Sequence, residues 1–251
     1  MPQPPTPPLP ADPVDASVDF TAGQLLLVDK PAGWTSFDVV NKLRYRLRRL
    51  TGVKRIKVGH SGTLDPMATG LLVIATGKAT KALSALTGLP KVYTGTIRFG
   101  ASTPTYDAES ELDATYSTEH LTAELLRGLV RERFSGEIEQ RPPAFSAIKV
   151  DGKRLYELAR RGQAVQVPTR RVEVSRFELT RVELPEADFE VACSKGTYIR
   201  SLAHDLGRAA DSGAYLTSLR RTRVGDYRIE DARDVEAITA ALDVRLESTP
   251  E

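Results

Sequence analysis

Residues 59–70 read GHSGTLDPMATG and are followed at once by the apolar run LLVIA at 71–75. The apolar run predicts a buried strand, and the glycines and small residues before it predict a loop. Glycine lets a backbone approach a ligand closely, and the ring of Pro66 restricts the chain directly after Asp65. The loop is therefore suited to presenting the carboxylate of Asp65 rigidly. The same composition is also typical of an ordinary turn.

The segment before this loop is the most basic part of the chain. Residues 42–57 contain eight lysines and arginines and no acid. The formal net charge of the whole chain is only +2, but both ends are acidic, and residues 23–229 carry 33 basic and 23 acidic residues. This balance favours a polyanionic partner, because phosphates neutralised by lysine and arginine release counterions. A charge run is also common on a solvated face.

Other chemistries lack the residues that they need. Cys193 is the single cysteine, and the three histidines are far apart, so neither a disulfide framework nor a zinc site is expected. A nucleotide-binding P-loop is not expected either, because six residues separate Gly70 from Gly77 and an alanine follows Lys78. A membrane span and a signal peptide are not apparent, so we expect a cytoplasmic protein without membrane contact.

The chain is expected to divide into three parts. Residues 1–23 begin with seven prolines in thirteen positions, which predicts a disordered leader. Residues 24–231 are expected to form one catalytic domain. Residues 232–251 are expected to be a short acidic tail.

Hydrophobic periodicity predicts the main elements of this domain. A strand is expected over 25–29, and Ser36 is expected to cap a helix whose buried stripe is Phe37, Val40, Leu43, Leu47 and Leu50. Because strands come in hairpins and helices are inserted irregularly, the pattern favours an α+β fold. Further strands are expected over 92–99, 171–184 and 188–193, and further helices over 121–134, over 153–161 and from about Thr197.

Two later segments also carry candidate functional residues. Residues 140–149 read QRPPAFSAIK, a composition that fits a rigid loop facing RNA or a buried crossing between strands. Residues 194–200 read SKGTYIR and place Arg200 in the first turn of a helix. An isolated arginine at such a position is usually a surface residue.

Seven short motifs follow one another along the chain: KPAGWTS at 30–36, GHSGTLDPMATG at 59–70, KVY at 91–93, TPTYD at 103–107, QRPPAFSAIK at 140–149, GTYIR at 196–200 and LRRTRVG at 219–225. Taken together and in this order, they resemble the TruB family of tRNA pseudouridine synthases. The resemblance covers Leu25 to about Asp231.

The resemblance implies a pseudouridine-synthase fold, with a mixed, largely antiparallel sheet and flanking helices and loops. It implies an isomerase that converts uridine 55 in the T loop of tRNA to pseudouridine without a metal ion or an organic cofactor. We expect the protein to be a monomer that binds the T stem-loop of tRNA. An obligatory protein partner is not expected.

The resemblance also implies roles for individual residues. Asp65 matches the catalytic carboxylate, Arg200 its charged partner, and Tyr93 the side chain that lies against the base and takes part in proton handling. His60 matches the residue that occupies the space left when the uracil is flipped out. Whether Asp65 attacks carbon or removes a sugar proton stays open, since both routes use an ionised carboxylate. The remaining expected substrate contacts are Tyr198, Lys30, Lys149, Arg220 and Arg221, and for Lys30 a structural role is equally open.

Three positions depart from the family pattern: Phe145 stands where tyrosine is usual, Tyr215 where histidine is usual, and Ser110 where glycine is frequent. The additional C-terminal RNA-binding domain of the PUA kind is not expected after Asp231. Two alternatives remain, a guide-RNA-dependent pseudouridine synthase subunit and an RNA-binding or tRNA-folding module without catalysis.

Overall fold

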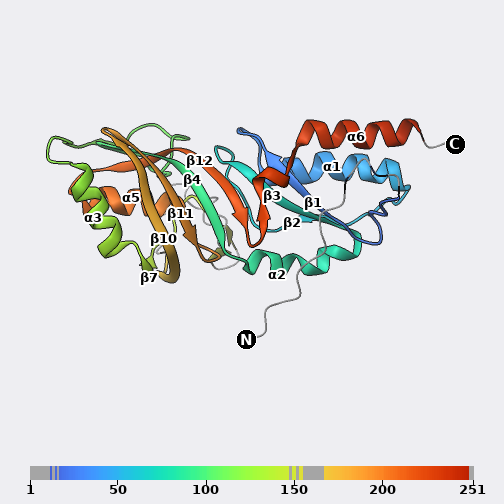
Figure 1. Ribbon diagram of the computed structural model, residues 1–251, viewed down its shortest axis with the longest axis horizontal. Helices are drawn as coiled ribbons and strands as arrows, with labels where there is room; N and C mark the ends of the chain where they lie inside the picture. The colour runs from blue at the N-terminus through green and yellow to red at the C-terminus, as the bar shows by residue number, and fades with distance from the viewer. Residues whose placement is uncertain are drawn as a thin grey trace. The chain divides into compact units, whose positions relative to one another are not determined.

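The fold is that of a computed structural model, which describes Asp12, Asp15 and residues 17–146, 149–150, 153–154 and 167–248. The chain forms two compact units. The first unit comprises Met1–Lys91 and Arg220–Glu251, and the second comprises Val92–Leu219. The chain passes from one to the other within strand β4 (Lys91–Phe99) and returns within strand β12 (Ala214–Val224). Figure 1 labels the main helices and strands of both units.

The sheet of the first unit is built around β3 (Thr69–Thr76). On one edge β3 pairs antiparallel with β1 (Leu25–Lys30), which pairs in turn with β14 (Arg233–Asp234) in parallel. On the other edge β3 pairs antiparallel with β2 (Val58–His60), and its first residues pair in parallel with the end of β12. Strand β13 (Tyr227–Arg228) extends β12 as a hairpin. The strands predicted over 25–29 and 71–75 are thus confirmed.

Two helices lie side by side on one face of this sheet, α1 (Ser36–Thr51) and α6 (Val235–Glu247) (Figure 1). Their apolar stripes join Val28 and Leu72 in one buried core. The opposite face is covered by the 3₁₀ helix η1 (Gly77–Ala82) and by α2 (Leu83–Gly88), whose Leu86 packs against Leu27 and Val73. A second 3₁₀ helix, η2 (Ile229–Asp231), leads into β14. Both faces of β1 and β3 are covered, which is why these strands are apolar without alternation.

The start of α1 differs from the prediction. Thr35 is the N-cap, and its side chain accepts a hydrogen bond from the amide of Asp38 in a capping box. Ser36 is buried instead, and Phe37 is 60% exposed rather than part of the stripe. Val39 takes the buried position, because the cap at Thr35 sets which side of the helix faces the sheet.

The two ends predicted to lie outside the domain contribute to its core. Phe20 is only 1% exposed, and the hydroxyl of Thr76 donates to its carbonyl over 2.9 Å. Val235 and Leu242 of α6 are fully buried. Within the described residues, the prediction of a leader to residue 23 and of a tail from residue 232 is therefore corrected. Apolar side chains of both segments pack on the sheet, although most of their neighbours in the sequence are polar.

The second unit contains a sheet in the order β12, β4, β11, β10, β7. Strands β10 (Arg170–Glu183) and β11 (Glu186–Cys193) form the predicted hairpin, and β7 (Gly136–Gln140) pairs antiparallel with β10. The side chain of Phe177 packs edge to face against Phe134 and Phe189, with ring centroids 6.5 and 5.9 Å away. The helices are α3 (Ala123–Arg133) and α5 (Ile199–Ala209), and both were predicted.

Four short strands complete this unit. Strand β5 (Ala101–Ser102) pairs with β6 (Ala114–Thr115), and β8 (Lys149–Val150) pairs with β9 (Lys153–Arg154). A helix was predicted over 153–161, but its first two residues are in β9 and the others lie outside the described residues. The mixture of sheets and irregularly placed helices confirms the α+β class. Among the described residues, the helices are too short or too polar to cross a lipid bilayer.

Candidate active site

The loop that carries Asp65 is fixed by contacts on both sides of that residue. The hydroxyl of Ser36 accepts a hydrogen bond from the Leu64 amide over 2.8 Å and donates to the Leu64 carbonyl over 3.1 Å. The amide of Ala68 donates to the Asp65 carbonyl over 3.1 Å. The half-buried Asp65 therefore sits on a backbone that is anchored to the first residue of α1.

Lys30 holds the residue after Asp65. Its side chain is fully buried, and its ammonium donates to the carbonyls of Pro31, Trp34 and Pro66 over 2.8, 2.5 and 3.3 Å. The amide of Gly33 donates to the same Pro66 carbonyl over 2.8 Å. A buried charge requires such partners, so Lys30 has a structural role, and its placement does not support an RNA contact.

Arg221 fixes the two ends of the loop. Its side chain is 1% exposed, Nε donates to the Leu71 carbonyl over 2.7 Å, and a terminal nitrogen donates to the Gly62 carbonyl over 3.2 Å. Gly70 has φ of 103°, and a Cβ there would lie 2.3 Å from the Arg221 carbonyl. Only glycine allows β3 and β12 to approach in this way. Arg221 is thus an internal brace, and its burial does not support the predicted phosphate contact.

Arg220 points to a different partner. Its two terminal nitrogens donate to the carboxylate of Asp29 over 2.6 and 3.0 Å, a bidentate ion pair, and one of them also reaches the Thr69 hydroxyl over 3.3 Å. The Arg220 side chain remains 39% exposed. It is therefore paired but still accessible.

His60 ends β2 immediately before the loop. Burial lowers the pKa of His60, a backbone hydrogen bond with Gly62 raises it in part, and the positive charge of Arg221 lowers it again, so that the net shift is downward. Its Nδ1 is buried without a hydrogen-bond partner among the described residues. The lowered pKa favours the neutral imidazole.

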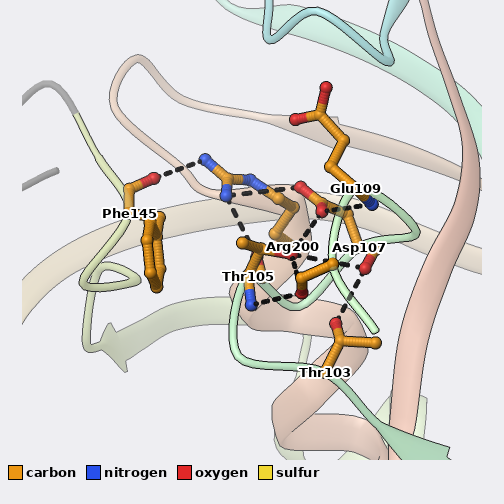
Figure 2. A network of polar contacts seen from close by, with 7 residues as sticks. Thr103, Thr105, Asp107, Glu109, Phe145 and Arg200 are labelled. Carbon is orange, nitrogen blue, oxygen red and sulfur yellow. Dashed lines mark hydrogen bonds and ion pairs between the residues drawn. The ribbon is translucent and has the colours of Figure 1, made fainter. Parts of the chain in front are cut away.

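In the second unit, Arg200 lies in a polar network at the start of α5 (Figure 2). Its guanidinium donates to the carbonyls of Thr105 and Phe145, each over 3.0 Å, and lies 3.4 Å from the carboxylate of Asp107. Both charged side chains are buried. The isolated-arginine interpretation is therefore wrong at Arg200.

Asp107 is itself oriented by its own loop. Its carboxylate accepts from the Thr105 hydroxyl over 2.5 Å and from the Glu109 amide over 3.0 Å, and its carbonyl accepts from the Thr103 hydroxyl over 2.7 Å (Figure 2). Thr103 and Thr105 belong to the TPTYD motif together with Asp107, whereas Glu109 follows the motif. The sequence alone indicated no role for Asp107.

The same loop meets α5 at a second point. Tyr106 has φ of 64°, a left-handed conformation that is uncommon outside glycine. Its ring stacks on His204 with centroids 3.8 Å apart. Because His204 lies one turn after Arg200, the loop contacts the helix over two successive turns.

Tyr198 is the N-cap residue of α5. Its amide donates to the side chain of Gln140 over 2.7 Å, and the Gln140 side chain donates back to its carbonyl over 2.9 Å. The guanidinium of Arg170 lies 4.6 Å from the centroid of its ring. Tyr93 is in β4 and is 9% exposed.

Two family models match the chain from residue 48 onward. Residues 48–199 match the N-terminal domain of TruB family pseudouridylate synthases, and residues 200–249 match the tRNA pseudouridylate synthase B C-terminal domain. The chain belongs to the TruB family.

Curated relatives of this TruB chain match it over nearly their whole length. It is 53% identical over 225 residues to tRNA pseudouridine synthase B of Flavobacterium johnsoniae, covering 89% of this chain and 98% of that protein. It is 54% identical over 226 residues to the protein of the same name from Phocaeicola vulgatus, covering 90% and 96%.

Solved structures show the same fold. A Cbf5–Nop10–Gar1 complex contains a chain with a TM-score of 0.66 and 29% identity, covering 88% of the TruB chain and 54% of the other. An H/ACA ribonucleoprotein bound to a substrate RNA contains a chain with a TM-score of 0.64 and 26% identity. The match covers 90% of the TruB chain and 56% of the other chain. The TruB chain thus spans about half the length of these two chains. The expected pseudouridine-synthase fold is confirmed.

The predicted site residues of the TruB chain fall in both units. The pairing of Asp65 with Arg200 joins residues of different units and stays a prediction. The side chain of Lys149 lies outside the described residues. Among the residues that are described, three or more metal-ligating side chains do not gather at one place. The first unit holds Lys30, His60, Asp65, Arg220 and Arg221, and the second holds Tyr93, Tyr198 and Arg200.

Proposed function

We propose that this chain converts uridine 55 in the T loop of tRNA to pseudouridine. The observation that carries the proposal is its identity of 53% and 54% to two proteins named tRNA pseudouridine synthase B, over nearly their whole length. These matches favour a tRNA enzyme over a guide-RNA-dependent subunit.

Asp65 is the proposed catalytic carboxylate. The reaction breaks the bond from N1 of the uracil to C1′ of the ribose, turns the base, joins C5 to C1′ and releases the C5 proton. Anchoring of Leu64 and Pro66 on either side of Asp65 supports this role, because a carboxylate that is already oriented costs little reorganisation during the reaction. Attack on the sugar carbon and removal of a sugar proton both start from the ionised form.

Arg200 is proposed to pair with Asp65 and to keep it ionised. Its support is the contact of its guanidinium with Thr105, Phe145 and Asp107, which fixes its direction. Tyr93 is proposed to lie against the flipped uracil, and Tyr198 to line the same pocket. His60 is proposed to fill the vacated position in the T loop, a role that suits a neutral ring.

The deciding experiment uses the purified chain alone with an unmodified tRNA transcript labelled with tritium at C5 of uridine. Release of tritium without added RNA or protein is expected, and Asp65→Asn should abolish release while binding is retained. Full activity of Asp65→Asn would refute the role of Asp65. A need for guide RNA would favour the second alternative, and binding without release would favour the non-catalytic module.

We further propose that the enzyme acts as a monomer in the cytoplasm without a partner protein. Sedimentation of the active protein, alone and with tRNA, tests the stoichiometry.

A further inference from the structure

The basic run of residues 42–57 divides into two sets in the structure. Three members bind within the first unit. Lys42 lies 3.4 Å from Glu236 of α6, Arg46 lies 3.1 Å from Asp243 of α6, and Arg44 donates to the Val58 carbonyl over 3.0 Å. The acidic residues of α6 therefore neutralise the side of α1 that faces α6.

The other five members are exposed: Arg48, Arg49, Lys54, Arg55 and Lys57. Within the described ranges of the chain, these five make no ion pair or hydrogen bond through their side chains. The guanidinium of Arg49 only approaches the ring of Tyr45, at 6.0 Å from its centroid. Their charges are thus unopposed by a neighbouring carboxylate.

Two large aromatic side chains are exposed on the same helix. Phe37 is 60% exposed and Tyr45 is 58% exposed, and they are eight residues apart, which places them on one helix face. Arg48 and Arg49 follow Tyr45 by three and four residues and so lie beside it. We call the surface formed by Phe37, Tyr45, Arg48, Arg49, Lys54, Arg55 and Lys57 the α1 outer surface.

The first and last residues of the α1 outer surface are both close in sequence to residues of the candidate site. Phe37 follows Ser36, whose hydroxyl binds Leu64 next to Asp65. Lys57 precedes β2, which ends at His60. Because a helix of this length extends about 24 Å, Arg48 and Arg49 lie far along α1 from the catalytic loop.

We propose that the α1 outer surface binds the phosphodiester backbone of the tRNA substrate, with the two aromatic rings packing against the RNA between the phosphate contacts. Exposed basic side chains interleaved with aromatic rings suit this ligand, because phosphates bind the charges and bases or sugars cover the rings. The inference rests on the proposed function for the identity of its RNA. In this proposal the exposed residues of the α1 outer surface bind RNA, whereas Lys42, Arg44 and Arg46 stabilise the first unit.

The test compares two triple variants that remove the same charge. R48Q/R49Q/R55Q alters the α1 outer surface, whereas R127Q/R131Q/R133Q alters three exposed arginines of α3. Binding of an unmodified tRNA transcript is measured at several salt concentrations in an Asp65→Asn background. We expect R48Q/R49Q/R55Q to weaken binding about tenfold or more and to reduce the salt slope by about 2 to 3, in keeping with about 0.9 per phosphate lost.

The α3 control should change binding less than about twofold. F37A/Y45A should weaken binding about fivefold or more without changing the salt slope, because it removes packing and no charge. In the Asp65-containing enzyme, R48Q/R49Q/R55Q should raise KM for tRNA and lower kcat/KM by about tenfold or more, because the lost phosphate contacts weaken substrate binding.

An unchanged affinity and slope for R48Q/R49Q/R55Q would overturn the proposal, and so would an equal loss in the α3 control. Failure of the wild type to isomerise tRNA would instead refute the proposed function. Because binding is measured without turnover, the two failures are distinguishable.

Discussion

The guanidinium of Arg200 and the carboxylate of Asp107 form a buried ion pair at 3.4 Å, with side-chain exposures of 5% and 0%. The two residues come from segments 93 positions apart in the sequence. A buried charge that loses its partner is costly, so each side chain constrains the other. Arg200 is thereby held as a charged group of fixed direction in the second unit.

Removing the carboxylate of Asp107 should impair both stability and catalysis. Asp107→Ala leaves Arg200 without its buried counter-charge, which should lower the free energy of unfolding by about 3–5 kcal/mol. Asp107→Asn retains an acceptor for the Thr105 hydroxyl and should be milder in stability, yet kcat should fall because Arg200 is less well fixed. Urea unfolding and single-turnover kinetics measure the two effects. Glu111→Gln, at an exposed position, is the control, and wild-type kcat in Asp107→Asn would contradict the role.

Replacing the buried ammonium of Lys30 should loosen the catalytic loop. Lys30→Met keeps most of the length of the side chain but leaves the carbonyls of Trp34 and Pro66 without this donor, so stability should fall by about 1–3 kcal/mol. A lower kcat with nearly unchanged tRNA affinity is expected, since Lys30 does not face solvent. Lys81→Met removes an exposed charge and should behave as wild type. A large loss of affinity with normal kcat would instead indicate an RNA contact.

His60 should make the protein less stable in mild acid. Its pKa in the fold is lowered, first by burial, so the unfolded chain takes up a proton more readily as pH falls below about 6.5. The neutral imidazole therefore contributes stability that is complete above this pH and decreases as pH falls through the lowered pKa. His60→Gln should show a smaller difference in unfolding free energy between pH 7.5 and pH 5.5 than the wild type. If wild type and His60→Gln lose the same unfolding free energy between pH 7.5 and pH 5.5, burial of His60 does not contribute to the pH dependence.

Asp205 should have the opposite pH dependence. Burial raises its pKa to about 6, and Arg208 and Arg141 oppose the shift. The folded state thus binds a proton more tightly than the unfolded chain, and stability falls as pH rises from about 4 to about 6. Asp205→Asn should raise the free energy of unfolding by about 1–2 kcal/mol at pH 7.5, and most of this gain should disappear at pH 4. A gain that is equal at both pH values would argue against a buried carboxylate.

Short-range patterns in the sequence are sufficient to predict the local elements and the family. Periodicity and turn residues, which act over a few positions, predicted strands over 25–29 and 71–75, a hairpin over 171–193 and a helix from about Thr197, and the structure has these elements with bounds one to two residues different. The motifs around Asp65 and Arg200 are equally local, so their order along the chain was sufficient to indicate TruB.

The burial of particular charged and apolar side chains became apparent from the tertiary contacts. Arg221 was expected to face RNA, but carbonyls of Leu71 and Gly62, about 150 positions away, surround its guanidinium. Phe20 and α6 were expected outside the domain, and they are drawn into the core by the apolar faces of β1 and α1. Burial of a charge or a ring depends on partners that other segments supply, and short-range patterns do not contain them.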